Sequence, residues 1–191
     1  MDIKVFSDLV DVLGKVANGL KTLSALPKAE RDEYRQTLDE TYSLIDAALT
    51  MVIIRLGDVL LYEKDDEFVA EVAKLGNIPE WYATERSLRI CSRLRVAVRE
   101  TETLRGKLAG TLSTNDWDSL LDNMKAILKT EHQLADFIGE RFSKLSQSVA
   151  NVGGQPQKVQ TARENVTRFR DALMLERRRL IEQETKLYEI V

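Results

Sequence analysis

The residue types that carry out most protein chemistry are scarce in this chain. It contains one histidine, His132, and one cysteine, Cys91. A zinc site of the usual type draws on several His and Cys side chains, and a di-iron bundle needs two Glu-x-x-His pairs on facing helices. Lys129 stands where such a pair would place its glutamate. We therefore expect no metal, no other cofactor and no enzymatic activity.

One short stretch comes close to a carboxylate-based site. All-helical nucleotide pyrophosphohydrolases hold magnesium with clustered carboxylates, and part of their site has the form Glu-x-Gly-Asp followed by apolar residues. The stretch Arg55-Leu56-Gly57-Asp58 resembles that segment, but Arg55 occupies the place of a carboxylate ligand. A carboxylate-dependent hydrolase therefore ranks third among the functions that we consider.

The elements that must position these residues follow from hydrophobic spacing. Apolar residues recur alternately three and four apart through most of the chain, which predicts long amphipathic helices. Pro27, Pro79 and Pro156 mark helix starts, because proline suits the first helical position. We predict an all-α fold in one domain, residues 1–191, built as an elongated up-and-down bundle of about five long antiparallel helices. The predicted helices span 2–25, 28–62, 79–110, 114–150 and 156–190, with a short extra helix near 66–75.

Two of these helices have distinctive patterns. The run from Ala47 to Ile54 is apolar on every face, so we expect the second helix at the centre of the bundle. The last helix has a heptad pattern typical of a coiled coil, in which Glu176 and Gln183 occupy two otherwise apolar positions. Polar residues at such positions are tolerated where a partner or water reaches them. We therefore include Glu176 and Gln183 in a predicted partner surface, which self-association would use.

Charge is unevenly distributed along the chain. Residues 1–83 carry nine basic and sixteen acidic side chains, whereas residues 84–110 carry seven basic and three acidic ones. Most of the arginines flank the apolar stripe of the third predicted helix, where their stems cover a helix–helix seam and their guanidinium groups can pair with the acidic first two helices. Nucleic-acid binding calls for a positive domain balance, and the sequence pI is about 5.4. The partner surface predicted here includes Arg86, Arg89 and Arg93.

The remaining expectations concern location and function. The first residues carry Asp2, Asp8 and Asp11 and lack the basic start and apolar run of a signal peptide, so a cytoplasmic location is expected. We predict a non-enzymatic interaction, scaffolding or regulatory module that acts through protein–protein contacts. The alternative is a membrane-acting bundle, pore-forming or lipid-binding, that uses its amphipathic first helix and its apolar second helix. That alternative rests on architectural analogy alone.

Overall fold

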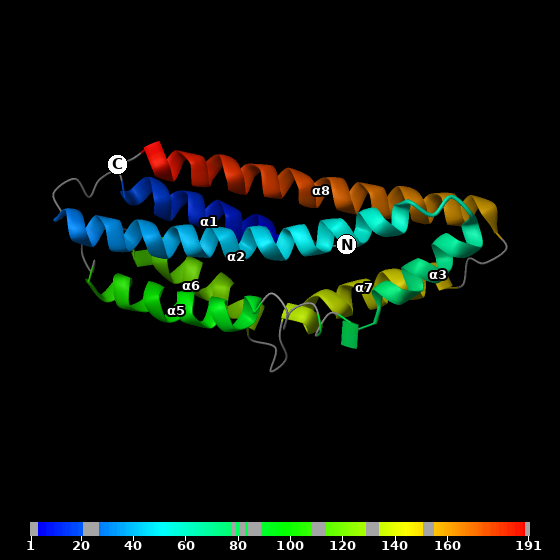
Figure 1. Cartoon of the computed structure of the whole chain (residues 1–191), viewed down its shortest axis with the longest axis horizontal. Coiled ribbons are helices and arrows are strands. Elements are labelled where there is room, and N and C mark those ends of the chain that lie inside the picture. Colours follow the sequence, from blue (N-terminus) through cyan, green and yellow to red (C-terminus); the bar gives the residue numbers. More distant parts are fainter. Residues whose placement is uncertain are drawn as a thin grey trace.

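The computed structural model describes residues 4–20, 27–77, 79–80, 83, 89–107, 114–128, 134–150 and 155–189. Within these residues all regular secondary structure is helical, which confirms the predicted all-α fold class. Seven described helices lie alongside one another in an elongated bundle (Figure 1).

Two long helices form the spine of this bundle. Helix α2 spans Lys28–Leu60 and helix α8 spans Pro156–Glu189. Each is about 50 Å long at 1.5 Å per residue. They lie side by side and run in opposite directions along the length of the molecule (Figure 1). The predicted helices 28–62 and 156–190 therefore match the structure to within two residues at each end.

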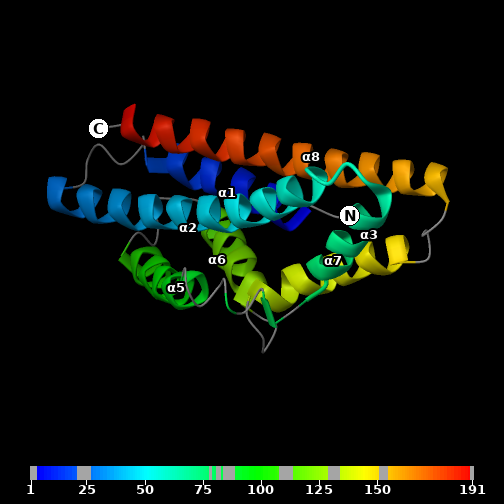
Figure 2. The ribbon, with the colours of Figure 1, turned by 45° about the vertical axis from the view of Figure 1, so that its right-hand side comes forward.

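The other helices each cover one half of the spine. Helices α1, α5 and α6 lie around the N-terminal half of α2, and α3 and α7 lie at its C-terminal end (Figures 1 and 2). Their bounds are α1 Lys4–Leu20, α3 Asp65–Leu75, α5 Ile90–Lys107, α6 Thr114–Leu128 and α7 Leu134–Ala150. Helix α1 packs on α6 and α8, α5 packs on α2 and α6, and α3 packs on α7. The bundle thus consists of two groups of helices that share α2 and α8.

Two of the predicted long helices are shorter in the structure. Arg89 has a φ of 53°, in the left-handed region where an α-helix of L-residues does not continue, so α5 begins only at Ile90. The predicted helix 114–150 is divided into α6 and α7, which point in different directions (Figure 2). Helix α6 packs on α1 and α5, whereas α7 packs on α3. Parts of the predicted helices 2–25, 79–110 and 114–150 lie outside the described residues, at 2–3, 21–25, 81–82, 84–88, 108–110 and 129–133.

The connection between α2 and α3 is fixed by an arginine of α8. The Arg163 guanidinium donates hydrogen bonds to the carbonyl oxygens of Tyr62 at 2.6 Å and Glu63 at 2.9 Å. It also lies 4.2 Å from the centre of the Phe68 ring, a cation–π distance. The acidic stretch 63–67 does interrupt the second predicted segment, and the short helix expected at 66–75 is α3.

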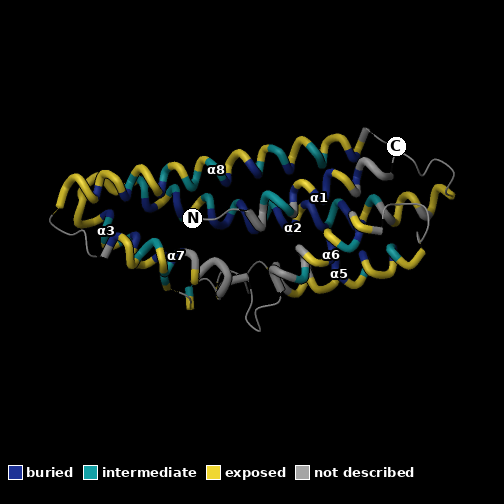
Figure 3. The backbone as a smooth tube through the Cα atoms, turned by 180° about the vertical axis from the view of Figure 1, so that it is seen from behind, coloured by how far each residue is buried: buried dark blue, intermediate teal, exposed yellow. Residues whose placement is uncertain are grey.

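The core confirms the central position expected for α2. This helix packs against α1, α3, α5 and α8. Within its apolar run only Ile54 is largely exposed, at 55%, and the other side chains are buried or half-buried. Figure 3 shows the buried residues along the inner faces of α2 and α8. The buried stripe of α8 keeps the predicted three–four spacing, through Val159, Ala162, Val166, Leu173, Glu176, Leu180 and Leu187.

Candidate interaction surfaces

The described residues contain no assembled metal site. No three His, Cys, Asp or Glu side chains among them lie close enough to hold an ion. His132 lies outside the described residues, and the backbone of Cys91 lies in α5. Arg55, which stands in place of a metal-binding carboxylate, forms an ion pair with Glu80.

The same arginine lines a cleft of about 550 Å³ between the end of α2 and α3. Arg55 and Lys74 are its basic side chains, and each is ion-paired with a carboxylate of the same cleft, Glu80 and Glu71 respectively. Val59 and Leu75 supply apolar lining. The described lining of the cleft combines internal ion pairs with apolar side chains.

Glu176 is buried and Gln183 is half-buried. The Glu176 side chain belongs to a residue that is only 6% exposed, and its carboxylate accepts a hydrogen bond from the Arg179 guanidinium at 2.7 Å. Arg179 also forms an ion pair with Asp11 of α1. Gln183 packs against Gly14 of α1 so closely that a Cβ atom added there would lie 2.7 Å from its carboxamide. Both polar positions of the heptad therefore serve the packing of α8 on α1, and Glu176 offers almost no surface to a partner.

A second cluster of polar side chains lies between α2 and α8. Arg177 donates two hydrogen bonds to Asp46, at 2.7 and 3.2 Å. Burial, followed by the neighbouring carboxylates Asp39 and Asp46, raises the pKa of Glu184. Tyr42 is fully buried, and its hydroxyl has no hydrogen-bond partner among the described residues. Burial and the nearby Glu184 carboxylate raise the pKa of Tyr42 far above its usual range, so its hydroxyl stays protonated.

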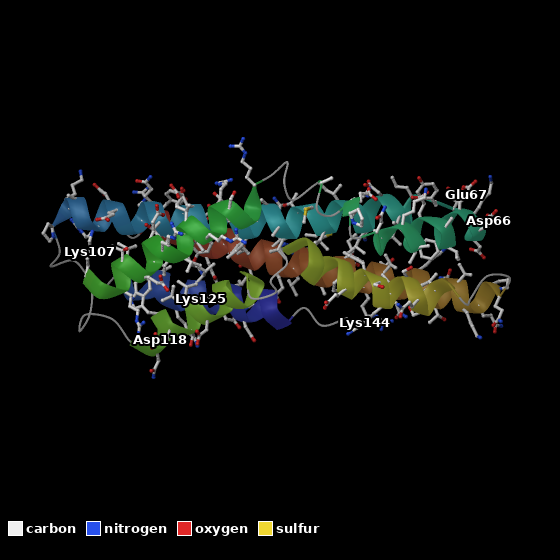
Figure 4. All side chains as sticks on the ribbon, turned by 90° about the horizontal axis from the view of Figure 1, so that it is seen from below. Asp66, Glu67, Lys107, Asp118, Lys125 and Lys144 are labelled. Carbon is white, nitrogen blue, oxygen red and sulfur yellow. The ribbon has the colours of Figure 1, made fainter. Side chains whose placement is uncertain are left out.

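Helix α5 uses its C-terminal basic residues for internal ion pairs. Lys107 pairs with Glu33 of α2 at 2.9 Å, so among the described residues a lysine, and none of the arginines expected to do so, pairs α5 with the acidic N-terminal half. Arg105 pairs instead with Asp118 of α6 at 2.6 Å, and Lys125 of α6 pairs with Glu102 at 2.5 Å. Lys107, Asp118 and Lys125 all lie at the end of the molecule opposite Asp66 and Glu67 of α3 (Figure 4). These pairs hold α5 against both of its neighbours.

The other arginines of this helix, and Arg89 just before it, face solvent. Arg89, Arg93, Arg95 and Arg99 are exposed, and none of them forms an ion pair within the described part of the chain. Val96 lies among them and is 49% exposed. We call these five residues the α5 arginine face. It includes the predicted Arg89 and Arg93, whereas Arg86 lies outside the described residues.

Sequence reasoning missed a surface on the solvent side of α8. Met174, Leu175, Ile181 and Tyr188 are between 42% and 55% exposed. We call these four residues the α8 outer face; Figure 3 shows the exposed side of this helix. Met174, Ile181 and Tyr188 recur every seven residues, which places them on one line along the helix. This seven-residue repeat is visible in the sequence, but the neighbouring heptad that forms the core contains more apolar residues and dominates the pattern.

Comparison of the chain with protein-family models, with curated proteins and with solved structures gives no significant match. The class of protein is therefore defined by the fold alone, an all-α bundle with two long antiparallel helices. Among the described residues no helix combines the length and the apolar character that crossing a membrane requires.

Proposed function

We propose that this protein is a non-enzymatic interaction module of the cytoplasm that associates with a second copy of itself through the α8 outer face. The observation that carries the proposal is the line of exposed Met174, Ile181 and Tyr188 with Leu175 beside it. Large apolar side chains that gather on one exposed face are typical of contact surfaces. Their seven-residue repeat suits packing along another helix.

The charges of this face support a two-fold symmetric contact. Arg178 and Glu182 lie on either side of Ile181, and both are exposed. In an antiparallel pair of α8 helices with the two-fold axis near Ile181, Met174 of each copy lies opposite Tyr188 of the other. Arg178 of each copy then lies beside Glu182 of the other. One patch can therefore complement itself, as an isologous dimer requires.

The size of the face sets the expected strength. From Met174 to Tyr188 the strip is about 21 Å long at 1.5 Å per residue. A single helix face of that length buries less than the roughly 800 Å² per partner that is typical of stable complexes. We therefore expect a reversible dimer with a dissociation constant in the micromolar range.

Sedimentation velocity over a concentration series tests this dimer. The variant Met174→Lys with Ile181→Lys should sediment as a monomer, whereas Leu61→Ser, which removes an exposed apolar side chain from the end of α2, should behave as the original chain. Arg178→Glu and Glu182→Arg should each weaken the dimer, and the two changes together should restore it, because the pair is reversed as a unit. A chain that stays monomeric up to about 200 µM would contradict a micromolar dimer.

Binding to lipid is the second candidate, and the exposure of Ile54 and Leu61 on α2 favours it. Flotation with neutral vesicles and with vesicles rich in phosphatidylserine tests it directly. Apolar insertion predicts that Ile54→Ser with Leu61→Ser abolishes flotation. If the original chain floats with neither kind of vesicle, this candidate is wrong.

A further inference from the structure

The α5 arginine face carries a local excess of positive charge in a chain whose formal net charge is −3. Arg89, Arg93, Arg95 and Arg99 are all exposed and form no ion pair within the described part of the chain. Arginines near carboxylates of the same fold usually pair with them, as Arg105 of this helix does with Asp118. The four guanidinium groups are therefore left available for an external anion.

Two carboxylates of α5, Glu100 and Glu102, form no ion pair with these arginines within the described part of the chain. Glu102 pairs with Lys125 of α6. Glu100 is half-buried on the side of α5 that faces α2, where burial, then Glu40 and Glu33, raise its pKa. Neither carboxylate neutralises the arginines, so the positive charge of the face persists at neutral pH.

The spacing of the exposed residues favours a helical ligand. Ser92, Arg95, Arg99 and Thr103 follow one another at intervals of three and four along the exposed side of α5, and Val96 lies four residues after Ser92 and three before Arg99. The Ser92 hydroxyl donates a hydrogen bond to the carbonyl oxygen of Arg89, and the Thr103 hydroxyl donates one to the carbonyl oxygen of Arg99. Both short side chains therefore lie close to their own helix. Arg93 lies three residues before Val96 and Arg99 three residues after it, so an exposed arginine flanks this apolar side chain on each side and a second helix can pack along the row.

We infer that the α5 arginine face binds an acidic amphipathic helix of a partner polypeptide. Arginine and exposed apolar residues are enriched at protein contacts, and arginine binds carboxylates with two parallel hydrogen bonds. Carboxylates of the ligand pair with Arg95 and Arg99, and its apolar side chains cover Val96. The inference rests on the proposed role as an interaction module, and it uses a face separate from the α8 outer face.

Nucleic acid and anionic lipid also attract arginine, but the setting of this face disfavours both. The acidic N-terminal half, with α2 beside α5, repels polyanions that extend beyond a single helix face. Val96 at the centre of the row gives a phosphate backbone nothing to bond, whereas it gives an amphipathic helix an apolar contact. Both polyanions enter the experiment as competitors.

The test uses a fluorescent amphipathic peptide of Glu, Leu and Ala, a scrambled peptide of the same composition, duplex DNA and phosphatidylserine vesicles. Fluorescence anisotropy of the full chain at about 50 and 300 mM NaCl should show that the amphipathic peptide binds and that salt weakens it. Arg95→Glu with Arg99→Glu should weaken the peptide affinity by at least about tenfold, because two attractive pairs become repulsive. The matched control is Lys144→Glu with Lys158→Glu, which changes the net charge equally on other exposed surfaces.

The outcomes separate this inference from its rivals. Loss of binding in the arginine variant, with less than about a twofold change in the control and weaker binding of the scrambled peptide, supports an acidic helical ligand. Equal loss in both variants, equal binding of both peptides, or tighter binding of DNA or vesicles overturns it. Sedimentation keeps the two proposals apart: the arginine variant should still dimerise, and an original chain that dimerises but binds no peptide refutes this inference alone.

Discussion

Replacing Tyr42 by phenylalanine should stabilise the protein, which is the reverse of the usual effect of losing a buried tyrosine hydroxyl. Tyr42 lies fully buried in α2, near Glu184 of α8. Its hydroxyl oxygen is inaccessible to solvent and has no hydrogen-bond partner among the described residues. Burial and the nearby Glu184 carboxylate raise the pKa of Tyr42, so the hydroxyl stays protonated and remains a buried donor without an acceptor among the described residues.

The magnitude follows from this geometry. A buried polar group without a partner costs about 1–3 kcal/mol relative to its solvated state. Tyr42→Phe removes that group and keeps the ring, so the cavity term of a large-to-small substitution stays small. We expect the free energy of unfolding to rise by about 1 kcal/mol, near the lower end of that range. For a chain of this size the melting temperature should then rise by about 2–4 °C.

Urea unfolding monitored by circular dichroism measures this change, with Tyr188→Phe as the matched control. The Tyr188 hydroxyl donates to Asp39, so its removal should cost up to about 1 kcal/mol and give the opposite sign. An unchanged denaturant slope would confirm that both variants unfold from the same native state. If Tyr42→Phe instead lowers stability by about 1 kcal/mol, the hydroxyl is hydrogen-bonded in solution and our reasoning is wrong.

Three further predictions concern α8 and its contact with α1. Glu184→Gln should stabilise the protein at pH 7. The pKa of Glu184 is raised in the folded state, so the ionised carboxylate destabilises the native state and the uncharged glutamine removes that cost. Stability should therefore decrease as the pH rises from the unfolded pKa of about 4.3 through the folded pKa, and the advantage of the Gln variant should vanish below that window in a pH series of urea titrations. Leu180→Ala should cost about 2–5 kcal/mol and Ile181→Ala less than about 0.5 kcal/mol in the same assay, because only Leu180 is buried; similar costs would contradict the assigned inner face. Gly14→Val should lower stability by about 1–3 kcal/mol through overpacking against Gln183, and Gln183→Ala should recover part of that loss; simple additivity would refute the contact.

Much of the helical framework could be predicted because the spacing of apolar residues is a local property. The bounds of α2, α3 and α8 agree with the predicted helices to within two residues. The break between α6 and α7 could not be read in the same way, since the apolar stripes on either side have the same period. Arg89 likewise gives no sequence signal for its left-handed backbone, because residues other than glycine rarely adopt it.

The candidate surfaces were likewise predictable only in part, because their exposure depends on the neighbouring helices. The arginine cluster of α5 was visible as a local excess of charge, but which arginines pair and which stay exposed depends on α2 and α6. Lys107 reaches Glu33 and Arg105 reaches Asp118, whereas Arg95 and Arg99 point to solvent. Glu176 and Gln183 were visible as polar positions in a heptad, yet Glu176 is buried and Gln183 packs against Gly14 of α1, and the exposed heptad of α8 lies on another face.

By itself the sequence determined an all-α chain, two long amphipathic helices, a central α2 and a basic α5. These features depend on periodicity, on helix-starting prolines and on composition, which act over a few turns of helix. Only the tertiary structure decided which helices share a half of the bundle, which polar heptad positions are buried, and which apolar and basic side chains remain exposed. Those outcomes depend on contacts between residues as distant in sequence as Asp11 and Arg179, and a local pattern does not encode its partner.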